Sequence, residues 1–216
     1  METVFLRTLP LSLPAGTPSF DGMPIDQYAE QLLHTYGHDT AVPLAVSSNG
    51  NCFFNSLSVA FTGSEGLAPH LRLRCTIYCL LHAESLSDQE YSNTMLTPSL
   101  ADDMKAICQD GGYSSFRAFV AAAEVLQCKI ESVYLPDNGN GDKVCGILNR
   151  NITPSMASSS AAAADVTEVR IIWTRTQEPD TGGVCVCQTT LSHWYTKVPS
   201  LSHTTESHQP VEMISH

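Results

Sequence analysis

Residues 49–57 read NGNCFFNSL, a turn signal followed directly by a helical apolar pattern. Asn and Gly at its start favour a turn, and Phe54, Leu57 and Phe61 then fall on one face of a helix. Cys52 therefore stands in the first turn of a predicted helix. There the helix dipole stabilises a thiolate, and unpaired N–H groups can face a developing negative charge. A buried structural cysteine after a turn would give the same pattern.

The neighbours of Cys52 complete a candidate site. Gly50 allows a sharp turn and the close approach of a substrate backbone. Asn51 is the expected N-cap of the helix, and the backbone N–H groups of Gly50 and Asn51 are the candidates for holding an oxyanion. The general base must come from elsewhere, and His193 lies far downstream, in the order typical of papain-like cysteine proteases.

The rest of the chain predicts helices first and a sheet last. We expect helices at 24–36, 69–85, after Ser99 and at 116–126, and strands at 129–135, 143–148, 167–174, 184–189 and 194–198. This order indicates an α+β domain with helices packed on a small, mostly antiparallel sheet. We predict a flexible arm at 1–23, one domain at 24–198 and a disordered tail at 199–216. The Ser/Ala-rich stretch 155–165 is predicted to be a surface loop.

Composition narrows the function classes. Of the 216 residues 43% are apolar and 15% are charged, with a formal net charge of −11. No basic cluster suggests nucleic-acid binding, and the run 72–74 (Arg-Leu-Arg) is interpreted as a solvated helix edge. No stretch reaches the roughly 20 apolar residues of a membrane helix, and the N-terminus lacks a secretory pattern. We therefore expect an intracellular protein, cytoplasmic or nuclear, that binds neither nucleic acid nor membrane.

The eight cysteines do not indicate a metal site or a disulfide framework. No C-x-x-C pair occurs, and Cys75 and Cys79 have the i, i+4 spacing of a helix core. The histidines of the tail are too scattered to predict metal binding. We expect buried thiols at most positions, with Cys52 as the exception, and no metal or cofactor.

Three blocks, in order, resemble the ovarian-tumour (OTU) family of deubiquitinases. Residues 49–57 are similar to its D-G-N-C-[LF]-[FY]-x-[SA] signature, 111–130 to its Gly turn, Ala-rich helix and core strand, and 193–195 (HWY) to its H-[WYF]-x element. Residues 71–82 also resemble the vertnin-like, transposon-derived OTU branch. The resemblance implies a papain-like OTU fold and a thiol-dependent hydrolase that cleaves isopeptide bonds of ubiquitin conjugates.

By the same resemblance the catalytic residues are Cys52, His193 and Asn49, without a cofactor. The expected partner is a conjugate of ubiquitin or of a ubiquitin-like modifier, and the expected state is a monomer. Two positions differ from the family pattern, since Asn49 replaces the usual Asp and Tyr195 replaces an Asn or Asp. The alternative is thus a catalytically weak or inactive OTU-like module that binds ubiquitin or acts as a scaffold.

Overall fold

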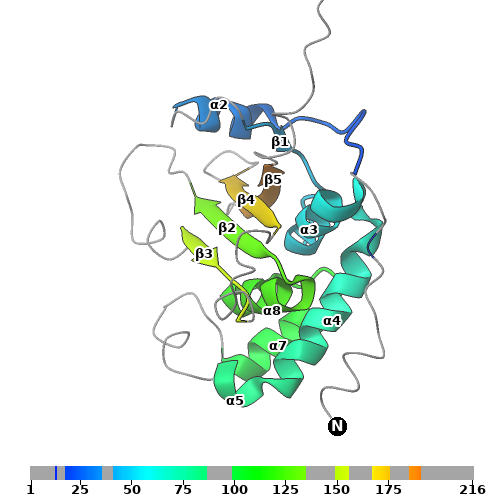
Figure 1. Ribbon diagram of the computed structural model, residues 1–216, viewed down its shortest axis with the longest axis vertical. Helices are drawn as coiled ribbons and strands as arrows, with labels where there is room; N and C mark the ends of the chain where they lie inside the picture. The colour runs from blue at the N-terminus through cyan, green and yellow to red at the C-terminus, as the bar shows by residue number, and fades with distance from the viewer. Residues whose placement is uncertain are drawn as a thin grey trace, which may run out of the picture.

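The computed structural model describes residues 13, 18–35, 41–86, 99–134, 149–155, 167–175 and 185–190, the last six and residues 174–175 by their backbone alone. Helices surround a central sheet (Figure 1). In chain order the elements are α2 (Gln27–Thr35), β1 (Pro43–Leu44), α3 (Cys52–Thr62), η1 (Glu65–Leu67), α4 (Ala68–Leu81), α5 (Ala83–Leu86), α7 (Leu100–Cys108), α8 (Phe116–Leu126), β2 (Lys129–Tyr134), β3 (Arg150–Ile152), β4 (Glu168–Arg175) and β5 (Cys185–Thr190). The predicted α+β class is confirmed.

The sheet has the strand order β1-β5-β4-β2-β3. Three of its pairings are antiparallel, as predicted, but the central pair β2–β4 is parallel, with Ile130 opposite Val169. The strand β3, which was not predicted, explains this difference. It returns antiparallel along one edge of β2, and the chain then crosses to the other edge to form β4. The predicted strands 143–148 and 194–198 lie outside the described residues.

Helices cover both faces of the sheet. Because side chains alternate along a strand, neighbouring residues of β4 enter different clusters. Ile171 belongs to the main core with α3, α4 and α8, whereas Ile172 packs with Leu33 of α2 in a smaller cluster. Figure 1 shows this arrangement, with α2 at one end of the molecule and α4, α5, α7 and α8 grouped at the other.

The helix α3 lies at the centre of the main core. Every residue from Cys52 to Ala60 is buried, because α3 packs against β4, β5, α4 and η1. Of the three residues that the sequence placed on one face, Phe54 and Leu57 are buried and Phe61 is partly exposed. Gly63 ends the helix in the left-handed conformation, with φ 72°, a geometry that favours glycine.

Local signals explain where the neighbouring helices begin and end. Ser99 and Ser115 cap α7 and α8, their hydroxyls accepting hydrogen bonds from the N–H groups of Asp102 (3.2 Å) and Arg117 (3.1 Å). The helix predicted at 69–85 is two helices, α4 and α5, which meet at His82. Buried alanines at 118 and 121–123 let α8 approach α4 closely.

The described part of the predicted arm contacts the domain. Phe20 and Met23 pack against the main core, and the Met23 N–H donates to the Phe20 carbonyl at 3.1 Å. Of the predicted loop 155–165, only Ser155 is described, and the tail 199–216 lies outside the described residues. The domain limits therefore stay predictions.

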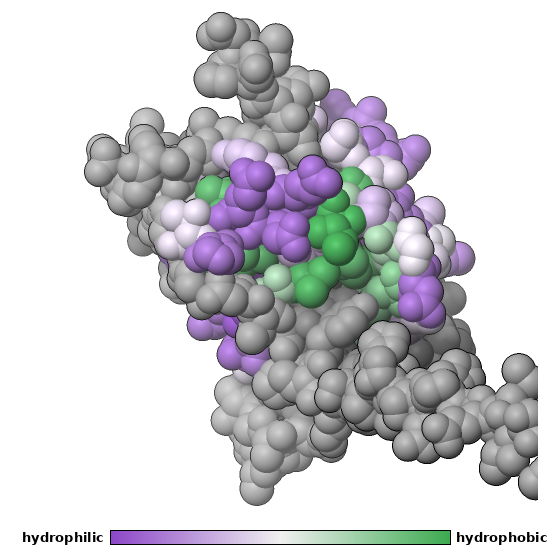
Figure 2. Space-filling model, turned by 90° about the horizontal axis from the view of Figure 1, so that it is seen from above, coloured by the Kyte–Doolittle hydropathy of each residue, from purple (hydrophilic) through white to green (hydrophobic). Residues whose placement is uncertain are grey.

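The surface seen from the α2 end is mixed. Hydrophilic residues border a smaller hydrophobic area there (Figure 2), and Ile25 and Tyr28 are 48% and 38% exposed. None of the described helices is both long enough and apolar enough to cross a membrane.

Candidate functional site

Cys52 is the first residue of α3, and its thiol is buried. A tight turn presents it, in which the Cys52 N–H donates to the Asn49 carbonyl at 2.9 Å. The next hydrogen bond, from Asn55 N–H to the Asn51 carbonyl at 2.8 Å, belongs to the helix. The structure thus places Cys52 where the positive end of a helix dipole favours a thiolate.

Asn49 organises this turn through its side chain. Its Oδ1 accepts hydrogen bonds from the Asn51 N–H at 3.0 Å and from Asn55 Nδ2 at 3.4 Å. Both bonds need only an acceptor oxygen, which an amide provides as a carboxylate would. The Asn51 N–H is therefore already engaged, whereas the Gly50 N–H has no acceptor among the described residues.

Asn51 occupies the N-cap position, but its side chain makes no capping hydrogen bond. Instead Nδ2 donates to Asp110 Oδ1 at 2.9 Å, and Oδ1 accepts from the Gly111 N–H at 3.1 Å. The predicted N-cap position is confirmed, but the Asn51 side chain does not cap the helix because it bridges to a second turn. That turn lies between α7 and α8.

The two turns touch at Gly50. A Cβ atom on Gly50 would lie 1.6 Å from the Gly111 carbonyl oxygen, so no larger residue fits without moving one backbone. Gly111 itself has φ +73°, the left-handed conformation. The sequence predicted that Gly50 allows a close backbone approach, and the structure supplies one from within the chain.

Arg72 of α4 donates hydrogen bonds to both turns. Its Nη2 donates to the carbonyls of Gly50 and Gly112, each at 2.9 Å. Its Nη1 donates to the carbonyls of Ile107 at 2.8 Å and Ala106 at 3.2 Å, in the last turn of α7. The interpretation of Arg72 as a solvated helix edge is wrong, because only 5% of the residue is exposed.

The electrostatics at Arg72 reflect this burial. Loss of water lowers the pKa of the guanidinium, and the nearby charges of Asp110 and Cys52 act in the opposite direction. The guanidinium carbon also lies 4.6 Å from the centroid of the Phe54 ring, in a cation–π contact. A positive charge is thus held within Coulombic range of the Cys52 thiol.

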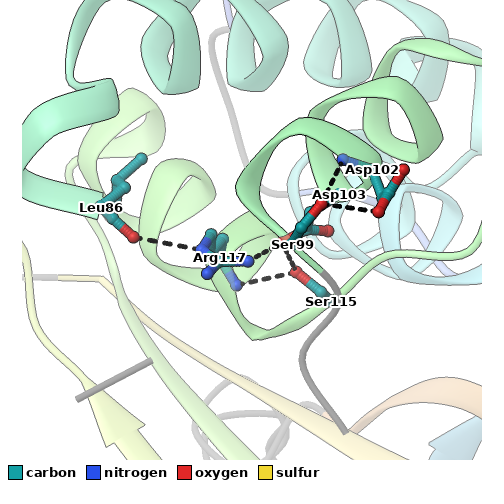
Figure 3. Close-up of polar contacts among 6 residues, drawn as sticks. All are labelled: Leu86, Ser99, Asp102, Asp103, Ser115 and Arg117. Atoms are coloured by element: carbon teal, nitrogen blue, oxygen red, sulfur yellow. Dashed lines mark hydrogen bonds and ion pairs between the residues drawn. The ribbon is translucent and has the colours of Figure 1, made fainter. Parts of the chain in front are cut away.

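A second buried polar cluster lies where α5, α7 and α8 meet (Figure 3). Arg117 Nη1 and Asp103 Oδ2 form an ion pair at 2.9 Å, and their side chains are 3% and 1% exposed. The same Asp103 oxygen accepts a short hydrogen bond from Ser115, while Arg117 Nε donates to the Leu86 carbonyl at 3.1 Å. This cluster fastens helices to one another.

The remaining site predictions fall elsewhere. His193 and Tyr195 lie outside the described residues, so their positions relative to Cys52 stay predictions. Among the described residues no group of three His, Cys, Asp or Glu side chains could hold a metal ion. Sequence reasoning missed Arg72 and Asp110. The first stands in a stretch of core-like periodicity, a signal that could have indicated burial.

A family model described as "Vertnin, OTU domain" matches residues 43–101 and 75–174, together more than half of the chain. The chain belongs to the vertnin OTU domain family. It is 27% identical to mouse vertnin over 172 residues and 28% identical to human vertnin over 171 residues, in each case 68% of this chain. These matches span 23% and 24% of the two vertnins, so the chain corresponds to about a quarter of their length.

Two solved structures are also similar to this OTU-family chain. One is described as the structure of the OTUD1 OTU domain, with 14% identity and a TM-score of 0.48, over 76% of this chain and 91% of that one. The other is the viral OTU domain protease from Dera Ghazi Khan virus, with 12% identity and a TM-score of 0.44, over 69% and 80%. Both TM-scores lie below 0.5, so the family assignment rests on the sequence matches.

Proposed function

We propose that the chain is a thiol-dependent hydrolase that cleaves isopeptide bonds of ubiquitin conjugates, with Cys52 as nucleophile and His193 as general base and acid. The position of Cys52 at the start of a buried helix, in a chain of the OTU family, is the observation that supports the proposal most strongly. The strand β5, which ends three residues before His193, packs against α3. No cofactor is needed for this chemistry.

The proposed reaction has two steps. His193 takes the proton of the Cys52 thiol, and the thiolate attacks the isopeptide carbonyl carbon, whose oxygen becomes an oxyanion. His193 then gives the proton to the leaving lysine amine as the C–N bond breaks, which leaves a thioester on Cys52. Water, deprotonated by His193, attacks the thioester and releases the ubiquitin carboxylate and the thiol.

The backbone N–H of Gly50 suits the oxyanion better than that of Asn51. The Gly50 N–H has no acceptor among the described residues, whereas the Asn51 N–H donates to Asn49 Oδ1. Removing one oxyanion donor slows comparable enzymes about 10²–10³-fold. We therefore infer that turnover is weak unless substrate binding releases the Asn51 N–H.

The engaged Asn51 N–H also favours a second function. An OTU-like module without turnover would bind ubiquitin, or hold other proteins together, through the same domain. Asn49 and Tyr195 at positions where the family has other residues agree with this alternative.

Ubiquitin with an alkyne electrophile at its C-terminus separates the two functions. Under the first proposal, the full chain forms a covalent adduct seen as a mass shift on a gel, and Cys52→Ala abolishes it. The same change should lower the cleavage of isopeptide-linked di-ubiquitin by more than roughly 10³-fold.

The matched control is Cys108→Ala, which removes an exposed thiol and should leave the adduct unchanged. Binding of ubiquitin without an adduct would support the module instead. An adduct that survives Cys52→Ala, or a chain that neither reacts with nor binds ubiquitin, would contradict the proposed hydrolase.

A further inference from the structure

Arg72 satisfies carbonyl groups from three separate segments. Two belong to the last turn of α7, where backbone carbonyls lack partners within the helix and a cation is favoured by the dipole. The other two are the carbonyl of Gly50, in the turn before Cys52, and the carbonyl of Gly112, in the turn between α7 and α8. One side chain thereby fixes the turn before Cys52 against the turn between α7 and α8.

In the part of the chain that the structure describes, the guanidinium of Arg72 contacts neutral carbonyls and not a carboxylate. Among the described residues no carboxylate lies within ion-pair distance of its guanidinium, whereas Arg117 contacts Asp103 directly. Asp110 acts on Arg72 only at longer range. A buried cation held by neutral carbonyls keeps its field, and in a low-dielectric interior that field reaches a nearby thiol.

We propose that Arg72 is a positioning residue of the cysteine site, which locks the Gly50–Cys52 turn in place and supplies the positive charge that favours the Cys52 thiolate. This inference rests on the proposed function, because a thiolate at Cys52 has a role only if Cys52 is a nucleophile. Both consequences come from the same geometry. Losing the guanidinium removes four hydrogen bonds and a charge together.

Other titratable groups act on the same site. Asp110 on the opposing turn, Cys75 on α4 and Cys108 on α7 all lie within electrostatic range of Arg72. Of these groups, Arg72 is the cation, and it bonds directly to the carbonyl two residues before the nucleophile. A purely structural clamp would hold the turns together without changing the pH at which Cys52 reacts.

The test is the pH profile of Cys52 alkylation in the full chain. Short pulses of iodoacetamide across a range of pH are quenched, and the Cys52 peptide is quantified by mass spectrometry. The wild-type midpoint should lie below that of a model cysteine peptide, about 8.5. Arg72→Gln should raise the midpoint, so that alkylation at pH 7, relative to its high-pH plateau, falls roughly tenfold.

Two further variants separate charge from geometry. Arg72→Lys keeps the charge without the planar fork and should give an intermediate midpoint. Arg74→Gln, on a partly exposed residue of the same helix, should leave the midpoint unchanged.

The proposal is overturned if Arg72→Gln folds, with the circular dichroism of the wild type, and keeps the wild-type midpoint. A wild-type midpoint at or above that of the model peptide overturns it as well, and this decides the matter even if Arg72→Gln does not fold. Because the assay needs no ubiquitin, the proposals fail separately. An Arg72-dependent low midpoint without a ubiquitin adduct contradicts only the proposed hydrolase, whereas an adduct with an ordinary midpoint contradicts only the role of Arg72.

Discussion

Arg72 and Arg117 are both buried, 5% and 2% exposed, but their charges are balanced in different ways. Arg117 forms an ion pair with Asp103, whereas the guanidinium of Arg72 bonds to four neutral carbonyls. The first arrangement cancels charge and joins helices. The second keeps charge close to Cys52. The difference indicates that the ion pair between Arg117 and Asp103 is structural, whereas the contacts of Arg72 are suited to supporting a reaction at Cys52.

The largest expected effect is at the ion pair between Arg117 and Asp103. Asp103→Ala removes the carboxylate that pairs with the buried Arg117 cation and should lower the free energy of unfolding by about 3–5 kcal/mol. Urea denaturation of the full chain measures this change. Glu168→Gln is the control, because Glu168 and Lys129 form a partly exposed pair at 3.3 Å and its loss should change stability by less than about 1 kcal/mol.

A double variant that removes both members of the buried pair tests whether the loss of stability comes from the unpaired charge. Asp103→Leu combined with Arg117→Met should recover most of the stability that Asp103→Ala loses, because no buried charge is left unpaired. Asp103 Oδ1 has no hydrogen-bond partner among the described residues, whereas the Ser115 hydroxyl and the Leu86 carbonyl each lose a partner in the double variant, so the recovery is incomplete. Equal losses in Asp103→Ala and Glu168→Gln would show that the cluster of Figure 3 does not fasten the helices.

A smaller effect is expected where the two turns meet. Gly50→Ala places a Cβ atom against the Gly111 carbonyl and should reduce the free energy of unfolding by about 1–3 kcal/mol as the backbones separate. Gly66→Ala is the matched control, since its Cβ would lie 3.7 Å from Ser64 Oγ, an ordinary contact. Thermal unfolding of both variants checks the difference, and identical melting temperatures would mean that the turns are not held together.

Measured per pH unit, the smallest effect concerns the thiol of Cys79, on which the charges of Asp103 and Arg117 both act. Burial, and then the charge of Asp103, raise the pKa of Cys79 to about 12, while Arg117 acts in the opposite direction. The unfolded chain loses this proton at lower pH than the folded chain, so the free energy of unfolding should fall as pH rises from about 9 towards 12. Each such group contributes up to about 1.4 kcal/mol per pH unit.

Cys79→Ala should flatten this slope by the contribution of one group. Cys128, whose pKa burial also raises to about 12, keeps its own contribution in the variant. Urea titrations at several alkaline pH values under reducing conditions measure the slope. If Cys79→Ala left the slope of the free energy of unfolding against pH unchanged, Cys79 would not hold its proton more tightly in the folded chain. The contrast with the reactive thiol proposed at Cys52 would then be wrong.

Periodicity predicted the helices well because each has a strong local signal. The apolar spacing of α8 and the serines before α7 and α8 are properties of short segments. The sheet was harder to predict, since the parallel pairing of β2 and β4 depends on the path of β3, a strand of three residues. Short strands give too few alternating positions to be recognised.

For the candidate site, local signals predicted that a glycine turn presents Cys52 at the start of a helix, because the turn and helix signals lie within nine consecutive residues. The burial of Arg72, the contact of Gly50 with Gly111 and the bridge from Asn51 to Asp110 could not be predicted in this way. These contacts join residues far apart in the chain. An arginine beside the apolar stripe of a helix has the same sequence spacing whether its guanidinium is solvated or bonded to the carbonyls of another turn. Its burial is therefore fixed only when the helices pack.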